Sequence, residues 1–414
     1  MNKLQSILAG VIALAAVSTA SAQTVLYVAG ANGDRATTNT AIPKLLTGTL
    51  IFKGTNTDAT KANFATWEGG SFNGTPVTVK AAYIGATGGI AAVAGSLPVK
   101  FLPDSATSGT ANPDPTVGSN PNDPRVPDIA MSTNFVSSSP FIGTYQGHFY
   151  EDLSQQDQIV SVVGLKWIAS KGFPGDNITP QLARYLWANG SAPLALFTGN
   201  AADQHKIVFA TGRNLDAGQR FAAQAESGLG LNAVVKQYKP TITGASGGVG
   251  GFVTGGTVNS HVLWPIETFS GVSSQFVGNS GATTGANLAP FLTATLGPST
   301  YSSIAGATAA YYISYLTPGD ADTIAIPNGA VELKWNGVPY SVENIRQGKY
   351  TFWVYEHLFY RAATSGIQKA FGDALANQIK TVDADVAGIK LDPGTPNFPV
   401  SRQEEGGLVT PTYF

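Results

Sequence analysis

Short apolar runs, separated by glycine-rich or polar turns, form the dominant pattern of this chain. Residues 25–29 (VLYVA), 77–84 (VTVKAAYI), 206–210 (KIVFA) and 309–316 (AAYYISYL) are runs of this kind, and they predict buried β-strands. Residues 159–168 (IVSVVGLKWI) are apolar almost throughout, which predicts one strand covered on both faces.

Helix start and stop signals lie between several of these runs. Thr179 and Pro180 fit the N-cap and first position of a helix that Gly190 ends. Asp216 and Gln219 resemble a capping box that opens a helix running to about residue 226. The alternation of strands and helices predicts an α/β fold with largely parallel sheets. Because no clean linker divides the chain, we expect two lobes that the chain visits more than once.

The C-terminal part carries three further signals. Asn336-Gly337 predicts a tight hairpin turn, and residues 364–387 have the pattern of an amphipathic helix. Residues 350–360 (YTFWVYEHLFY) hold six aromatic side chains. An aromatic platform for a sugar and ordinary core packing both fit this segment, and core packing is the commoner use of large aromatics.

The N-terminus has the order of a secretory signal peptide. Lys3 precedes an apolar run at residues 7–17, and Ala20-Ser21-Ala22 forms a small-residue cleavage motif. The run is too short to span a bilayer of about 30 Å as a helix, which disfavours an uncleaved anchor. We therefore expect cleavage after Ala22 and a periplasmic or secreted mature chain with no membrane insertion.

Composition narrows the classes of partner. The chain has 414 residues and no cysteine, so disulfides, thiolate metal sites and cysteine catalysis are excluded. Charged residues make up 12% of the chain and the net charge is −2, so no basic surplus exists for binding a phosphate backbone. We expect no nucleic-acid partner.

Polar and glycine-rich loops follow several of the predicted strands. Such loops at Gly30, Gly85, Ser132 and Gly212 would present backbone N–H groups and helix N-termini toward one site, although ordinary α/β turns look the same. Arg213 stands at a strand end before a predicted helix. Its guanidinium is suited either to an anionic ligand or to a structural ion pair with a nearby acid.

Motifs of catalysis are weak. Residues 244–248 match G-x-S-x-G around Ser246, but the residues that follow make a poor helix, which a nucleophile elbow requires. The histidines are scattered without metal-ligand spacing, and no phosphate-loop or dinucleotide fingerprint occurs. We therefore expect no enzyme activity, no cofactor and no metal site.

A series of segments in a characteristic order carries a resemblance to a known family. The chain resembles the phosphate-type periplasmic substrate-binding proteins of ABC transporters, which have the two-lobed type II, or Venus flytrap, α/β fold with a hinge and an interlobe cleft. The matching segments are residues 28–32 (VAGAN), 83–89 (YIGATGG), 130–134 (AMSTN), 213–219 (RNLDAGQ), 312–315 (YISY), 336–339 (NGVP) and 348–352 (GKYTF).

Some residues depart from the family pattern. Asn134 stands where the family has a phosphate-contacting Asp, and Ala217 and Gln219 replace the Ser and Thr of its S-G-T motif. Arg213 and Gly218 are kept. An Asp acceptor selects a protonated oxyanion, whereas Asn both donates and accepts, so the ligand stays open.

The resemblance implies an extracytoplasmic solute-binding protein that takes a small polar or anionic ligand, phosphate or a related oxyanion first, for uptake by an ABC permease. It implies a first lobe of residues 23–150 and 316–400, a second lobe of residues 151–315, and a tail at 401–414. The expected ligand-binding residues are Gly30, Ala31, Gly88, Gly89, Ser132, Asn134, Arg213 and Gly218. The alternatives are a structural or surface protein that binds nothing, and a secreted serine hydrolase.

Overall fold

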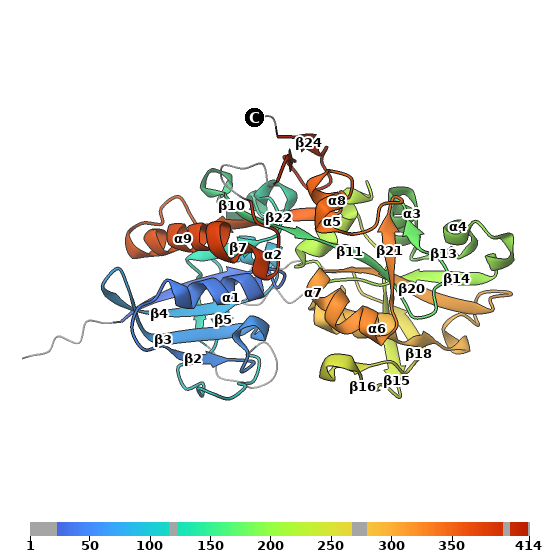
Figure 1. Cartoon of the computed structure of the whole chain (residues 1–414), viewed down its shortest axis with the longest axis horizontal. Coiled ribbons are helices and arrows are strands. Elements are labelled where there is room, and N and C mark those ends of the chain that lie inside the picture. Colours follow the sequence, from blue (N-terminus) through green and yellow to red (C-terminus); the bar gives the residue numbers. More distant parts are fainter. Residues whose placement is uncertain (1–22, 116–122, 267–279, 392–397, 413–414) are drawn as a thin grey trace, which may run out of the picture.

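The structure is a computed structural model that describes residues 23–115, 123–266, 280–391 and 398–412. The predicted signal peptide, residues 1–22, lies outside these residues. Two lobes stand side by side, each built on one large sheet flanked by helices (Figure 1). The predicted α/β class and two-lobed arrangement are confirmed.

The first lobe is organised around a mixed sheet. Within the described residues its seven strands have the order β10 (Gln158–Gly164), β22 (Trp353–Phe359), β7 (Ile129–Ser132), β1 (Thr24–Gly30), β4 (Thr75–Ala82), β3 (Phe64–Phe72) and β2 (Ile51–Gly54). Helix α2 packs on β1 and β7, and α9 packs on β10. The helices of this lobe are α1 (Arg35–Lys44), α2 (Ala86–Ala94) and α9 (Gly366–Gln378).

The second lobe contains a smaller mixed sheet. Over the described ranges its six strands have the order β12 (Asn177–Ile178), β21 (Val331–Trp335), β11 (Lys166–Ala169), β20 (Ala309–Leu316), β14 (Lys206–Ala210) and β13 (Ser191–Pro193). Its helices are α3 (Pro180–Asn189), α4 (Ala195–Thr198), α5 (Gly218–Glu226), α6 (Gly285–Thr293), α7 (Pro318–Asp320) and α8 (Val342–Arg346). Helix α3 has the predicted cap, since Thr179 Oγ1 accepts from the Leu182 N–H, and the predicted stop at Gly190.

Several short strands lie outside the two large sheets. A small sheet of β15 (Tyr238–Thr243), β18 (Thr257–Leu263) and β19 (Thr295–Leu296) borders the second sheet. Two-stranded pairs are formed by β5 (Val99–Phe101) with β6 (Asp123–Arg125), β8 (Gly143–Tyr145) with β9 (His148–Tyr150), β16 (Ser246–Gly247) with β17 (Val253–Thr254), and β23 (Val400–Ser401) with β24 (Thr410–Pro411).

Residues 159–168 form two strands rather than the one predicted. β10 pairs with β22 in the first sheet, β11 pairs with β20 and β21 in the second, and Leu165 lies between them. Gly164, the last residue of β10, packs against Tyr340, since a Cβ there would lie 2.5 Å from its ring. An apolar run signals burial but does not tell which sheet the strand joins.

The chain therefore changes sheets later than expected. It leaves the first sheet after β10 and returns to it between β21 and β22, whereas the sequence placed these crossings near residues 150 and 315. The expectation of largely parallel sheets was also wrong. β1 runs parallel to β4 and β7, but β22 is antiparallel to both of its neighbours, and β11 is antiparallel to both of its own.

An aromatic core joins the two sheets where the chain crosses. Trp167 stacks on Trp335 and on Phe352, with ring centroids 5.3 Å and 4.8 Å apart. Tyr350 and Trp353 are also fully buried in this cluster. The core interpretation of residues 350–360 is thus confirmed, and the crossing region is tightly packed rather than loose.

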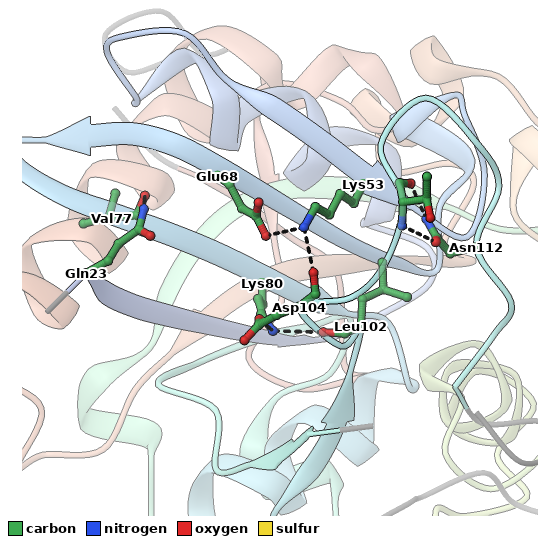
Figure 2. A network of polar contacts seen from close by, with 9 residues as sticks. Gln23, Lys53, Glu68, Val77, Lys80, Leu102, Asp104 and Asn112 are labelled. Atoms are coloured by element: carbon green, nitrogen blue, oxygen red, sulfur yellow. Dashed lines mark hydrogen bonds and ion pairs between the residues drawn. The ribbon is translucent and has the colours of Figure 1, made fainter. Parts of the chain in front are cut away.

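A buried lysine anchors the loop that follows β5. Figure 2 shows Lys80 of β4 donating to the carbonyl of Leu102 (2.9 Å) and to the carboxylate of Asp104 (2.7 Å). Lys53 of β2 bridges Glu68 and the carbonyl of Asp104. These bonds hold the start of the loop against the edge of the first sheet. No helix within the described residues is long and apolar enough to cross a bilayer.

Candidate functional site

Loops from both lobes meet at one place, which we call the interlobe junction. The N–H of Gly85, just before α2, donates to the Gly30 carbonyl (3.0 Å). The N–H of Thr87 donates to the Asp216 carbonyl of the second lobe (3.2 Å). The Thr87 hydroxyl donates to the Leu215 carbonyl (3.2 Å). The structure thus brings together predicted loops that lie far apart in the sequence.

Three of the expected ligand-binding residues have structural duties here. A Cβ on Gly89 would lie 2.7 Å from the Cα of Gly30, and a Cβ on Gly30 would lie 1.9 Å from the Met131 carbonyl oxygen. The N–H of Ala31 donates to that same carbonyl (2.9 Å). These small residues let α2 and β7 approach β1 closely. Gly88 is buried in the first turn of α2.

Asn134 is the most unusual residue of the junction. Its side chain is fully buried, and neither of its amide atoms has a hydrogen-bond partner among the residues the structure describes. The side chain faces the start of α5, because a Cβ on Gly218 would lie 2.4 Å from Asn134 Oδ1. Buried amide groups almost always have partners, so a group of this kind calls for an explanation.

Neighbouring residues fix the position of Asn134. Its N–H donates to the hydroxyl of Ser132 (3.1 Å), which is itself fully buried at the end of β7. The hydroxyl of Thr133 also faces Gly218, at 2.1 Å from the position of a Cβ. The loop after β7 therefore presents two polar side chains to the N-terminus of α5.

The predicted capping box of α5 does not form. The helix begins at Gly218, and its N-cap is Ala217 rather than Asp216. Alanine offers no side-chain acceptor, so the first N–H groups of α5 are not capped by their own N-cap residue. Asp216 instead lies one residue earlier, where its carboxylate accepts from the Asn214 amide (3.1 Å).

Arg213 lies at the junction with its guanidinium bonded to protein groups. Nε donates to the Ala282 carbonyl (2.9 Å), one terminal nitrogen to Gln219 Oε1 (2.7 Å), and the other to the Thr283 carbonyl (2.9 Å). Only 2% of the residue is exposed, and burial lowers the pKa of Arg213 to about 10, which leaves it charged at neutral pH.

A buried acid, Asp320, lies close enough to Arg213 for the two to interact electrostatically. Burial raises the pKa of Asp320, while Arg35 of the first lobe and Arg213 of the second act to lower it. The Asp320 carboxylate lies against the first residue of α6, 1.9 Å from the position of a Cβ on Gly285. A carboxylate at a helix N-terminus is a favourable arrangement.

A pair of buried acids lies behind the first-lobe side of the junction. Asp34 and Glu356 lie close enough for each carboxyl to affect the pKa of the other, Thr38 donates to Asp34 (2.8 Å), and Ser161 donates to Glu356. Burial raises the pKa of both carboxyls, and repulsion from Glu356 raises that of Asp34 further. The two carboxyls therefore titrate as a pair rather than independently.

Sequence reasoning missed two parts of the junction. Thr87 contacts the second lobe, whereas the prediction named only its neighbours Gly88 and Gly89, and named them as ligand-binding residues. Residues 280–283, which wrap the guanidinium of Arg213, were not singled out. The Thr284 cap of α6, which bonds to the Asn287 N–H (3.0 Å), is the signal that marks this helix start.

Ser246 has no nucleophile elbow. It lies exposed in β16, paired with β17, and is followed by a short 3-10 turn instead of a helix. In the described part of the chain, no group of three or more His, Asp or Glu side chains could hold a metal ion.

Comparison with known proteins gives structural likenesses only. No family model matches the chain, and no curated protein matches it. A substrate-binding protein with bound phosphate from Clostridium perfringens is 11% identical over 89% of this chain and 100% of its own, with a TM-score of 0.44. An ABC-type phosphate transport receptor from Vibrio cholerae is 10% identical over 87% and 96%, with a TM-score of 0.41. PstS from Borrelia burgdorferi is 12% identical over 88% and 96%, with a TM-score of 0.38.

Proposed function

We propose that this protein binds a small polar or anionic solute at the interlobe junction. In this proposal the mature chain works outside the cytoplasm, makes and breaks no bond, uses no cofactor, and passes its ligand to an ABC permease in the membrane. The location follows from the N-terminal segment of the sequence, and the mode of uptake follows from the order of segments that resembles phosphate-type binding proteins.

Asn134 carries the proposal. Leaving both amide atoms of a buried side chain without a partner costs about 1–3 kcal/mol per group. Within the described residues these atoms have none, and they face the start of a helix whose N-cap is alanine. A ligand that accepts from Asn134 Nδ2 and from the first N–H groups of α5 would satisfy these donors, and a protonated ligand oxygen would satisfy Asn134 Oδ1.

The chemistry of the junction favours an oxyanion. The N-terminus of α5 favours negative charge, and the buried Arg213 keeps its positive charge close by. A guanidinium has five N–H groups, and Arg213 uses three of them in its bonds to Ala282, Gln219 and Thr283. The other two are left for a ligand. Since Asn134 both donates and accepts, its side chain is suited to an unprotonated or a protonated ligand oxygen.

The test is a thermal-shift screen of the mature chain, starting at Gln23, against phosphate, sulfate, other oxyanions, sugars and amino acids. A ligand present at 100 times its dissociation constant should stabilise the protein by about 2.7 kcal/mol. We expect Asn134→Ala to abolish the shift and the exposed Asn189→Ala to preserve it. A full shift in Asn134→Ala would place the binding site elsewhere.

A second candidate is a structural protein that keeps the fold and binds nothing. The bonds of Arg213, Ala31 and Thr87 to protein groups favour it, because they already satisfy donors that a ligand would use. The absence of any shift in the screen, with a well-folded wild-type protein, would support this candidate over a solute-binding role.

A further inference from the structure

The C-terminal hairpin contacts both lobes. Residues 398–412, which we call the C-terminal hairpin, pair Val400 with Pro411 and Ser401 with Thr410. The hairpin lies at the top of the molecule, close to α5 and β22 (Figure 1). Phe398 packs its ring on Trp353, with centroids 5.3 Å apart, which roots the hairpin in the aromatic core.

On the first-lobe side, the hairpin holds the loop that carries Asn134. Glu405 is 6% exposed, and its carboxylate accepts from the Phe135 N–H (2.8 Å) and from the Ser138 hydroxyl. Phe135 follows Asn134 directly. Both oxygens of one buried carboxyl group therefore accept from this loop and tie it to the hairpin.

On the second-lobe side, the hairpin holds α5. Arg402 forms an ion pair with Glu226 at the end of α5, donates to the Thr351 carbonyl, and lies over the Trp353 ring at 3.9 Å. The backbone of Gly406 touches the same helix, because a Cβ there would lie 2.5 Å from the Ala225 carbonyl carbon. Helix α5 therefore meets the loop of Asn134 at its first residue and the hairpin at its last turn.

We propose that the C-terminal hairpin is a clasp that holds the two lobes closed at the interlobe junction, and that its release opens them. A single hairpin that binds the loop after β7 and the helix after β14 resists any motion that separates the two. Opening the junction therefore requires the bonds of Glu405 or those of Arg402 to break. The consequence for ligand capture rests on the proposed function, whereas the closure itself needs no ligand.

The clasp should respond to pH near neutrality. Burial raises the pKa of Glu405 to about 7, against the opposing effects of His357, the Phe135 N–H and Arg402. For a carboxyl whose pKa is raised on folding, the extra stability is complete below the ordinary pKa and is lost as pH rises through the raised one. We expect the clasp to hold more firmly in mild acid and to loosen as pH rises through about 7.

The test measures the distance between the lobes directly. Because the chain has no cysteine, Thr57→Cys and Gln204→Cys place two spin labels at exposed positions, one in each lobe. Distances are measured by electron–electron double resonance in the mature full-length protein without ligand. The variants are Glu405→Ala, Ser138→Ala, which removes one donor and leaves the hairpin intact, and Glu404→Ala, the exposed neighbour, as the matched control.

We expect Glu405→Ala and Ser138→Ala to add a population of longer distances and to lose hydrogen-exchange protection at the Phe135 N–H, while Glu404→Ala matches the parent. Glu405→Gln should remove the pH response. Should Glu405→Ala fail to fold, Ser138→Ala decides the question. Loss of Phe135 protection with unchanged interlobe distances would overturn the clasp, as would full protection in Glu405→Ala.

The same variants separate this inference from the proposed function. With inorganic phosphate as the probe, a solute-binding protein whose clasp is weakened should release phosphate faster. If phosphate binds none of the variants but Glu405→Ala still opens the lobes, the clasp is supported and the proposed binding of an oxyanion is contradicted. If phosphate binds and the distances never change, the solute site stands and the clasp does not.

Discussion

Asn134 and Arg213 stand on opposite sides of the same junction, and the structure treats them differently. Both are buried polar residues at the ends of strands, and both were expected to bind ligand. The guanidinium of Arg213 donates from each of its nitrogens to neighbouring protein oxygens. The amide of Asn134 has no hydrogen-bond partner among the described residues.

Residue type and position thus predict where polar side chains lie together. They do not predict which of these side chains are bonded to other protein groups and which are left to bind a ligand. Arg213 is bound by residues 280–283, a segment distant in sequence. Asn134 belongs to a loop that is fixed through its backbone, so its side chain is held in place without being used. Of the two, Asn134 is the better candidate for ligand contact, and Arg213 is better described as a structural charge.

The largest expected effect comes from Arg213→Ala. Removing the guanidinium leaves the Ala282 and Thr283 carbonyls and Gln219 without donors in a buried site, so we expect a loss of about 3 kcal/mol or more of unfolding free energy. Urea denaturation measures it, with the exposed Arg184→Ala as control. A variant of unchanged stability that only loses ligand binding would reverse our assignment of the two residues.

A smaller effect of the opposite sign is expected from Asn134→Leu. Replacing an unsatisfied buried amide by an apolar side chain of similar size should stabilise the ligand-free protein by about 1 kcal/mol. The same variant should show no thermal shift with any oxyanion. If Asn134→Leu instead destabilises the protein strongly, the amide has a structural duty like that of Arg213, and the contrast between them disappears.

The smallest effect is expected from Glu356→Gln, which probes the acid pair behind Asn134. The pKa of Glu356 is raised by burial, so its share of the stability is full below the ordinary pKa and declines as pH rises through the raised value. The variant should flatten this decline. Unfolding measured from mildly acidic to mildly alkaline pH, with the exposed Glu343→Gln as control, detects it. Parallel curves for variant and wild type would show that the pair does not titrate in this range.

Local signals predicted individual elements well. The strands at residues 206–210 and 309–316 and the helix between Thr179 and Gly190 have the predicted bounds, because caps, stops and apolar runs act over a few residues. The turn at Asn336-Gly337 also forms, with the bridge between Trp335 and Val338 that such a turn creates.

Long-range pairing could not be predicted in the same way. Nothing local tells that β10 and β11 join different sheets, or that residues 280–283 wrap Arg213. The role of the C-terminal hairpin could not be predicted either. In the sequence Glu405 and Arg402 resemble ordinary surface charges, and only the fold of the hairpin buries them. The sequence predicted which loops gather at the junction, but contacts between distant segments decide the duty of each residue.

The position of β22 bears on the order in which the chain folds. This strand lies between β10 and β7, and it comes after β21 in the sequence. During synthesis β1, β4 and β7 are made long before β22. Until β22 is made, the edge of β7 that pairs with it stays open. Pairing across so long a stretch of chain is slow. The first lobe, although most of its strands are made first, is completed last.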